Sequence, residues 1–243
     1  MFFLKNPNLP KKKVIAAVAW DCDATKNLEV EILIPTFPVS TLPYPLNFHA
    51  DLQLHHMGGN TFLSCPEAYE YYKQKLSPLG AYIIKGETGL RCNYPEDIAY
   101  NIARIRGIAI HNTKYTDPEA KKYFSENGVI LHHVNQGYSK CQVAVCGKNH
   151  IITSDPGIYA VATGCGLNTL LIEQGHIFLE GFDYGFFGGC AALTKPGELY
   201  LTGSIKNHPS RNKIYAFLEK HHIELFESAE SPPVDIGSII CIA

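Results

Sequence analysis

The chain has 243 residues, of which 46% are hydrophobic and 18% charged, and its formal net charge is −2. This composition predicts a globular core and excludes disorder, and without a long run of one sign of charge we expect neither nucleic acid nor a membrane as partner. No apolar stretch approaches the roughly 20 residues that span a bilayer. Residues 1–4 are apolar and precede the lysines at 11–13, the reverse of a secretory signal, so we expect a cytoplasmic protein.

The N-terminal part of the chain predicts two apolar strands. Residues 14–20 and 31–34 have the strand pattern, and a short helix is expected between them at 24–28. Four prolines follow within eleven residues, which indicates a semi-rigid connector. This part therefore contributes strands but not a complete folding unit.

A complete unit begins near residue 46. Residues 52–54 and 61–63 are apolar strands joined by a Gly-Gly-Asn turn, which is a hairpin signal. A helix is expected over 66–76, because a proline stands at its first position and acidic residues lie in its first turn. Gly80 ends that helix, and an apolar strand follows at 81–84. The order is strand, strand, helix, strand.

The same order of elements is expected three more times. The predicted elements are, in the second unit, a strand at 108–110, a helix from 117 and a strand at 129–131; in the third, strands at 142–145 and 151–153, a helix from 166 and a strand at 177–179; and in the fourth, strands at 190–193 and 199–201, a helix from 209 and a strand at 223–225. With Ile83, Ile130, Ile177 and Ile223 as markers, the last strands are 47, 47 and 46 residues apart. A period of this length indicates one supersecondary unit used repeatedly.

The two ends of the chain together supply a fifth unit, so we expect a closed ring without an exposed sheet edge. The fold class is then α/β, a pseudo-fivefold propeller of ββαβ modules around a central axis, in a single domain over residues 1–243. The modules are expected at about 46–90, 91–135, 136–181, 182–230, and 231–243 with 13–35.

Such a ring resembles the pentein fold, the superfamily of guanidino-group-modifying enzymes. Residues 234–241 resemble the closing strand of the dimethylarginine hydrolases, in which an Asp-Gly precedes the nucleophilic cysteine. A further set of segments resembles an uncharacterised bacterial family assigned to this fold: residues 49–52, 136–141, 152–155, 185–189 and 234–238. The glycines of 185–189 are expected to allow a close backbone approach near the axis.

The resemblance implies an axial pocket in which a cysteine thiolate attacks an amidine or guanidine, without a cofactor. Cys241 matches the nucleophile, and His49 matches the His of a His-x-Asp motif that moves protons. The remaining residues would hold a small polar, cationic substrate, since a guanidinium is a planar fork that carboxylates grip. They are Asp51, Lys140, Asp183 and Asp235.

The residues themselves favour a shared face but leave alternatives open. In an extended strand, His49, Asp51, Gln53 and His55 lie on one side. Lys140 is expected to face the same cavity as Asp51, because each stands nine residues before a turn asparagine. Equally, Cys241 fits a buried apolar position, Asp235 a turn, and the polar face a solvated one.

Two functions therefore remain. The first is a C–N hydrolase or amidinotransferase. The second is a catalytically silent ring that binds a small polar ligand or a protein. A zinc or iron site from His49, Asp51 and His55 would need a further ligand that the sequence does not identify, so we expect no metal.

Overall fold

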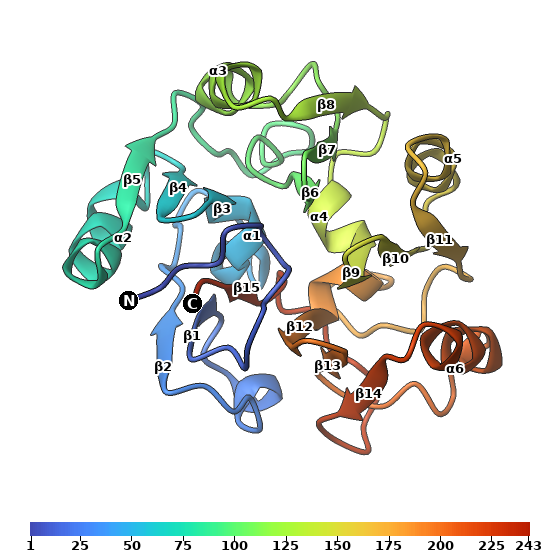
Figure 1. Cartoon of the computed structure of the whole chain (residues 1–243). Helices are drawn as coiled ribbons and strands as arrows, with labels where there is room; N and C mark the ends of the chain where they lie inside the picture. The colour runs from blue at the N-terminus through green and yellow to red at the C-terminus, as the bar shows by residue number, and fades with distance from the viewer.

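The computed structural model describes residues 1–243 and contains five three-stranded sheets arranged around a central axis (Figure 1). Listed from the axis outwards, they are β3 (Leu54–Gly58), β4 (Thr61–Ser64) and β5 (Tyr82–Lys85); β6 (Ala103–Ile105), β7 (Ile108–His111) and β8 (Ile130–His133); β9 (Val143–Gly147), β10 (His150–Thr153) and β11 (Asn168–Leu171); β12 (Ala191–Lys195), β13 (Glu198–Leu201) and β14 (Glu224–Glu227); and β15 (Ile240–Cys241), β1 (Ala16–Ala19) and β2 (Ile32–Pro35).

All five sheets have the same strand directions. The inner strand is antiparallel to the middle strand, and the middle strand is parallel to the outer one. A parallel pair needs a crossover, and in four sheets a helix on the outside of the ring supplies it (Figure 1). These helices are α2 (Tyr69–Leu76), α3 (Pro118–Glu126), α5 (Pro156–Gly164) and α6 (Arg211–Lys220). None of the helices is long and apolar enough to cross a membrane.

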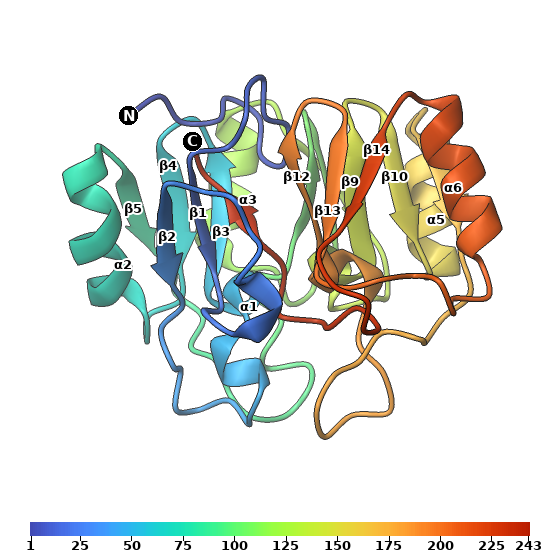
Figure 2. The ribbon, with the colours of Figure 1, turned by 90° about the horizontal axis from the view of Figure 1, so that it is seen from below.

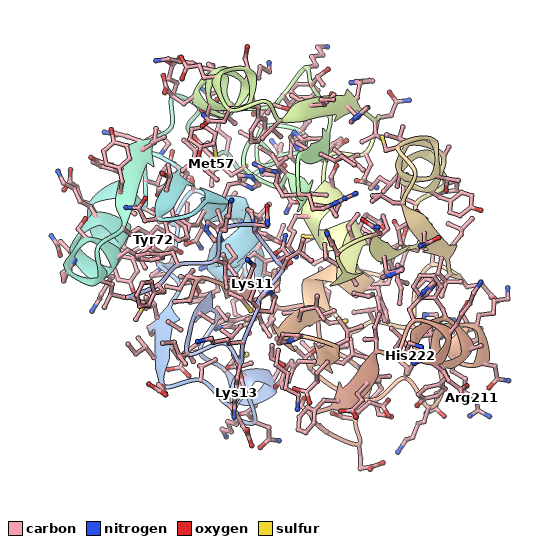
Figure 3. All side chains as sticks on the ribbon, in the orientation of Figure 1. Lys11, Lys13, Met57, Tyr72, Arg211 and His222 are labelled. Carbon is pink, nitrogen blue, oxygen red and sulfur yellow. The ribbon has the colours of Figure 1, made fainter.

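The two ends of the chain close the ring, as the sequence predicts. β15 pairs with β1, with Cys241 opposite Ala17 and Ile240 opposite Val18. Both termini lie at one end of the ring, and the segment before β1 runs across that end (Figure 2). In Figure 3, Lys11 of this segment lies over the middle of the ring, whereas Arg211 and His222 lie at its periphery.

The core lies between the helices and the sheets and between neighbouring sheets. Phe62, Tyr72 and Leu76 are fully buried in a cluster of 29 residues that joins the first unit to the closing strands. Burial of each such side chain contributes roughly 1.5–3 kcal/mol. The Tyr72 hydroxyl (Figure 3) also donates a 2.8 Å hydrogen bond to Gln53 Oε1, which ties the outer helix to the axis.

The third unit corrects the predicted element boundaries. Its helix is α5, which begins directly after Asp155, whose carboxylate accepts a 2.7 Å hydrogen bond from Ile158 N. The helix expected from 166 and the strand expected at 177–179 are therefore wrong, and β11 takes the outer position. Because Phe178 forms only an isolated bridge with Val234, the even marker spacing came from a segment outside the sheet. The outer strands begin at residues 82, 130, 168 and 224, at uneven intervals.

A second correction concerns the approach to the inner strands. The segment expected as an extended strand from His49 contains a one-turn helix, α1 (Ala50–Gln53). Neighbouring segments hold this turn, since Asp51 N donates to Gly237 O at 3.1 Å and Gln53 Nε2 donates to a backbone carbonyl at 2.8 Å. Similar turns, α4 (Ser139–Gln142) and the 3₁₀ turn η4 (Phe187–Cys190), precede β9 and β12. The three turns bring the segments that precede β3, β9 and β12 towards the axis.

Candidate active site at the ring axis

Three side chains that can bind a metal ion or a proton meet where α1 and α4 approach each other. One ring nitrogen of His49, one carboxylate oxygen of Asp51 and the sulfur of Cys141 all lie within 4.8 Å of one another. All three side chains are buried. We call these residues, with Lys140 and Ser238, the axial centre.

The Asp51 carboxylate is the hub of this centre. Its Oδ2 accepts hydrogen bonds from Ser238 Oγ at 2.6 Å and from the Cys141 thiol at 3.0 Å. Lys140 Nζ donates to the same Ser238 oxygen at 3.0 Å. A serine hydroxyl therefore relays between the buried ammonium and the buried carboxylate, and three units of the ring meet in one network.

Asp51 and Lys140 occupy matching positions, as the sequence predicts from their spacing to the turns. Each is the second residue of its one-turn helix and stands three residues before an inner strand. Gly188 has this position in η4, and a Cβ there would lie 2.5 Å from backbone atoms of Val143. The glycine thus lets two turns pack directly against each other at the axis.

Asn101 positions the α4 turn that carries the thiol. Its Oδ1 accepts hydrogen bonds from Lys140 N at 2.7 Å and from Cys141 N at 3.2 Å, and its Nδ2 donates to Cys141 Sγ at 3.1 Å. The sulfur consequently has one donor that favours a thiolate and one acceptor for the thiol proton.

Asp235 is buried beside this centre and is held by backbone. Its carboxylate accepts hydrogen bonds from Phe186 N at 2.8 Å and from Gly237 N at 2.9 Å. A Cβ on Gly189 would stand 2.0 Å from Asp235 Oδ1, so the glycine-rich segment does allow the close approach expected of it. Burial raises the pKa of Asp235 to about 6, although the two N–H groups oppose that rise.

Burial also sets the protonation of the axial centre. It lowers the pKa of His49 to about 4, a shift that the Asp51 charge partly offsets, so the imidazole is neutral at pH 7. The pKa of Asp51 is raised, first by burial. The pKa of the Cys141 thiol is raised well above its usual range by burial and by the charges of Asp51 and Asp235. In this state the proton stays on the sulfur.

Two of the residues that sequence reasoning proposed share no hydrogen bond with this centre. Cys241 is buried in a cluster with Ala192 and Tyr200, where its thiol donates to Leu193 O at 3.4 Å. Burial raises the pKa of this thiol to about 12. Asp183 is exposed in the loop after β11 and lines a separate surface cavity of about 290 Å³. His49, Asp51, Lys140 and Asp235 are the four that converge.

The space beside the axial centre is small. A cavity of about 20 Å³ borders Asp51, Lys140, His55 and His56, and Pro7 and Asn8 of the N-terminal segment line it from outside. This volume accommodates one water molecule. His49 Nε2 and Asp51 Oδ1 are buried without any hydrogen-bond partner, so the centre has unused capacity to bind a proton or an ion.

Sequence reasoning missed three members of this arrangement. Cys141 stood within the matched segment 136–141 without a role, because alternation along an extended strand would point it away from Lys140, whereas the helical turn brings both to the axis. Ser238 stood within the matched segment 234–238 without a role, and nothing in the sequence marked Asn101. The metal alternative is also changed, because Cys141, and not His55, joins His49 and Asp51.

The architecture is that of the pentein α/β propeller. The chain is similar to agmatine deiminase of C. jejuni, with a TM-score of 0.54, 10% identity and coverage of 93% of this chain and 89% of that one. It is also similar to a dimethylarginine dimethylaminohydrolase adduct, with a TM-score of 0.53, 11% identity and coverage of 88% and 92%. A dimethylarginine hydrolase of Pseudomonas aeruginosa complexed with citrulline gives a TM-score of 0.50 at 11% identity, with coverage of 88% and 92%.

Within this fold the chain has a defined family. The model of the Family of unknown function (DUF6873) matches residues 21–240, and the protein belongs to that family. No curated protein matches the chain.

Proposed function

We propose that this protein breaks a C–N bond of an amidine or guanidine by covalent catalysis, with Cys141 instead of Cys241 as the nucleophile. The observation that carries the proposal is the 3.0 Å hydrogen bond from the Cys141 thiol to Asp51, with the neutral His49 ring beside both. The similarity to agmatine deiminase and dimethylarginine dimethylaminohydrolase supplies the class of substrate.

The raised pKa of the Cys141 thiol is compatible with this role when the substrate is a cation. A guanidinium next to Asp51 and the sulfur favours the thiolate by Coulomb attraction. The thiol proton then moves to His49, whose Nε2 has no hydrogen-bond partner. Asn101 Nδ2, 3.1 Å from the sulfur, stabilises the resulting thiolate.

The reaction follows from these positions. The thiolate forms a C–S bond to the amidine carbon, and the C–N bond breaks as protonated His49 gives its proton to the departing amine. The covalent thiouronium is then attacked by water, which loses a proton to His49. The C–S bond breaks, the thiolate leaves, and a ureido or amide product is released. A second amine in place of water makes the same cycle a transfer.

One observation favours the second candidate, a catalytically silent ring that binds a small polar ligand. The cavity of about 20 Å³ is smaller than a guanidinium group, so catalysis requires the segment with Pro7 and Asn8, or a loop at the opposite end, to move. A ring that never opens would keep the thiol protonated and unreactive.

Labelling with 2-chloroacetamidine distinguishes the two. We expect the folded protein at neutral pH to gain one adduct that peptide mass spectrometry locates on Cys141. Cys241→Ser is the matched control, since it removes an equally buried thiol, and it should keep the adduct, whereas Cys141→Ser should lose it. Labelling that appears only after unfolding would favour the silent ring. Release of ammonia or amine from a panel of guanidines and amidines would then identify the substrate.

A further inference from the structure

The axial centre has the composition of a transition-metal site. His49 offers an imidazole nitrogen, Asp51 a carboxylate oxygen and Cys141 a sulfur, and these donors already lie within 4.8 Å of one another. They come from two units that are distant in the sequence, on the one-turn helices α1 and α4 or next to them. The ring therefore holds the donors in place before any ion binds.

Two of the three residues each have an unpaired polar atom. His49 Nε2 and Asp51 Oδ1 are fully buried and make no hydrogen bond. Buried polar atoms are almost always paired, because an unpaired one loses its hydration without compensation. A bound ion would pair both atoms at once. The other Asp51 oxygen would keep its hydrogen bond to Ser238.

The donor set selects the kind of ion. Sulfur and imidazole ligands suit Zn²⁺ and its relatives Co²⁺ and Fe²⁺, whereas Mg²⁺ and Ca²⁺ prefer oxygen alone. Three protein donors leave a fourth tetrahedral position. Of the three ligand residues, Asp51 also borders the cavity of about 20 Å³, which has room for one water molecule.

The charges at the axis also favour a dication. Two carboxylates, Asp51 and Asp235, are buried there beside one amine, Lys140. An ion that displaces the thiol proton adds positive charge next to these carboxylates. The hydrogen bond of Lys140 to Ser238 does not involve the three ligand atoms.

We propose that His49, Asp51 and Cys141 bind one divalent transition-metal ion of the zinc type, and that the bound ion blocks the thiol. The exchange is M²⁺ plus Cys141 thiol giving M–S(Cys141) and a released proton. Binding does not depend on the proposed activity, and only the blocking of catalysis rests on it.

Cobalt titration of the metal-free full chain tests the site. We expect one equivalent of Co²⁺ to bind and to give the near-ultraviolet charge-transfer band of cobalt–thiolate coordination, and Zn²⁺ to remove that band. Cys141→Ser should abolish the band and weaken binding at least about tenfold. His49→Gln should keep a weaker band, and Cys241→Ser, the matched buried thiol, should bind like the wild type.

The absence of a cobalt–thiolate band, or a band that survives in Cys141→Ser, would overturn the site. Binding that disappears in His221→Ala would do the same, because it would place the ion on the half-buried stacked pair His150–His221, whose rings lie 3.9 Å apart.

Repeating the 2-chloroacetamidine experiment with chelator and with Zn²⁺ separates this inference from the proposed function. Labelling of Cys141 that Zn²⁺ prevents supports both. Labelling without any cobalt band leaves the catalytic proposal and rejects the metal site. A cobalt band without labelling in chelator keeps the metal site and rejects the catalytic proposal. The absence of both signals rejects both proposals.

Discussion

Cys141 and Cys241 are both buried near the axis, yet their surroundings are opposite. Cys141 lies among a carboxylate, an amide, an imidazole and a neighbouring ammonium, whereas Cys241 lies among apolar side chains and meets one backbone carbonyl. The difference follows from the element that carries each residue. The one-turn helices before the inner strands point polar groups at the axis, and β15 itself contributes packing.

The polar region around Cys141 also depends on more hydrogen bonds and close backbone contacts than the apolar region around Cys241. Asn101 holds the α4 turn, Ser238 relays between Lys140 and Asp51, and Gly188 and Gly189 let backbones approach. Since buried charges are costly unless they are hydrogen-bonded, the two Ser238 contacts offset part of the desolvation penalty of Lys140 and Asp51. Substitutions in the polar region should therefore lower the free energy of unfolding more than substitutions in the apolar region.

The largest effect is expected for Gly189→Ala. The new Cβ would stand 2.0 Å from Asp235 Oδ1, against a carboxylate that two backbone N–H groups hold. We expect a loss of about 4 kcal/mol or more in the free energy of unfolding, measured by urea denaturation.

Gly164→Ala is the control, because a Cβ at the end of α5 meets nothing within 4 Å. It should change stability by less than about 1 kcal/mol. Equal stability of the two variants would show that the Asp235 region accommodates the added methyl group. The polar region would then be no more sensitive to substitution than the apolar one.

Asp51→Ala is expected to cost about 3 kcal/mol. It removes the acceptor of both Ser238 and Cys141 and leaves the buried Lys140 ammonium short of a carboxylate. Adding Lys140→Met to this variant should recover at least about 1 kcal/mol in a double-mutant cycle. Breaking the exposed pair of Lys26 and Asp23 with Asp23→Ala should leave the urea midpoint unchanged. Additive effects of Asp51→Ala and Lys140→Met would mean that the two charges do not interact.

The ring could be predicted from the sequence because hairpin turns and caps are local signals. Gly-Asn turns and the Asp117-Pro118 start of α3 mark elements from neighbouring residues alone, and β15 pairs with β1 as the need to close the ring requires. The helix and the outer strand of the third unit were predicted wrongly although the Asp155-Pro156 cap was an equally local signal, because the even spacing of apolar triplets was given more weight. Periodicity is weaker evidence than a cap.

The axial centre was only half predictable for a different reason. His49, Asp51 and Lys140 follow from matching positions in repeated units, but the one-turn helices depend on contacts between units, such as Asp51 N with Gly237 O. Cys141 was assigned the wrong direction because that turn was expected to be extended. Asn101 acts by holding the α4 turn of the next unit, and the residues around Asn101 in the sequence do not indicate this contact.

The pH dependence of stability sharpens the comparison further. Burial raises the pKa of Asp235 from 3.8 to about 6, so the folded protein binds this proton more tightly than the unfolded chain does. Its contribution to stability is therefore full below pH about 4 and is lost as the pH rises through about 6. The shift corresponds to about 3 kcal/mol.

Asp235→Asn isolates that contribution. The free energy of unfolding of the wild type minus that of the variant should fall as the pH rises from 4 to 6 and stay flat from 7 to 8. An Asn side chain accepts only one of the two backbone hydrogen bonds, so the variant is less stable at low pH. A difference that rises with pH would show that the N–H groups outweigh burial and that the pKa is lowered.

The smallest effect is expected in the apolar region. Cys241→Ala removes one sulfur from a packed cluster and one weak hydrogen bond to Leu193 O, at a cost of about 1 kcal/mol. Neither cobalt binding nor 2-chloroacetamidine labelling should change, because Cys241 shares no hydrogen bond with the axial centre. If the variant lost labelling while its urea midpoint stayed near that of the wild type, Cys241 would be the reactive thiol. The apolar cluster would then have to open in solution, and the distinction between the two cysteines would be conformational instead of chemical.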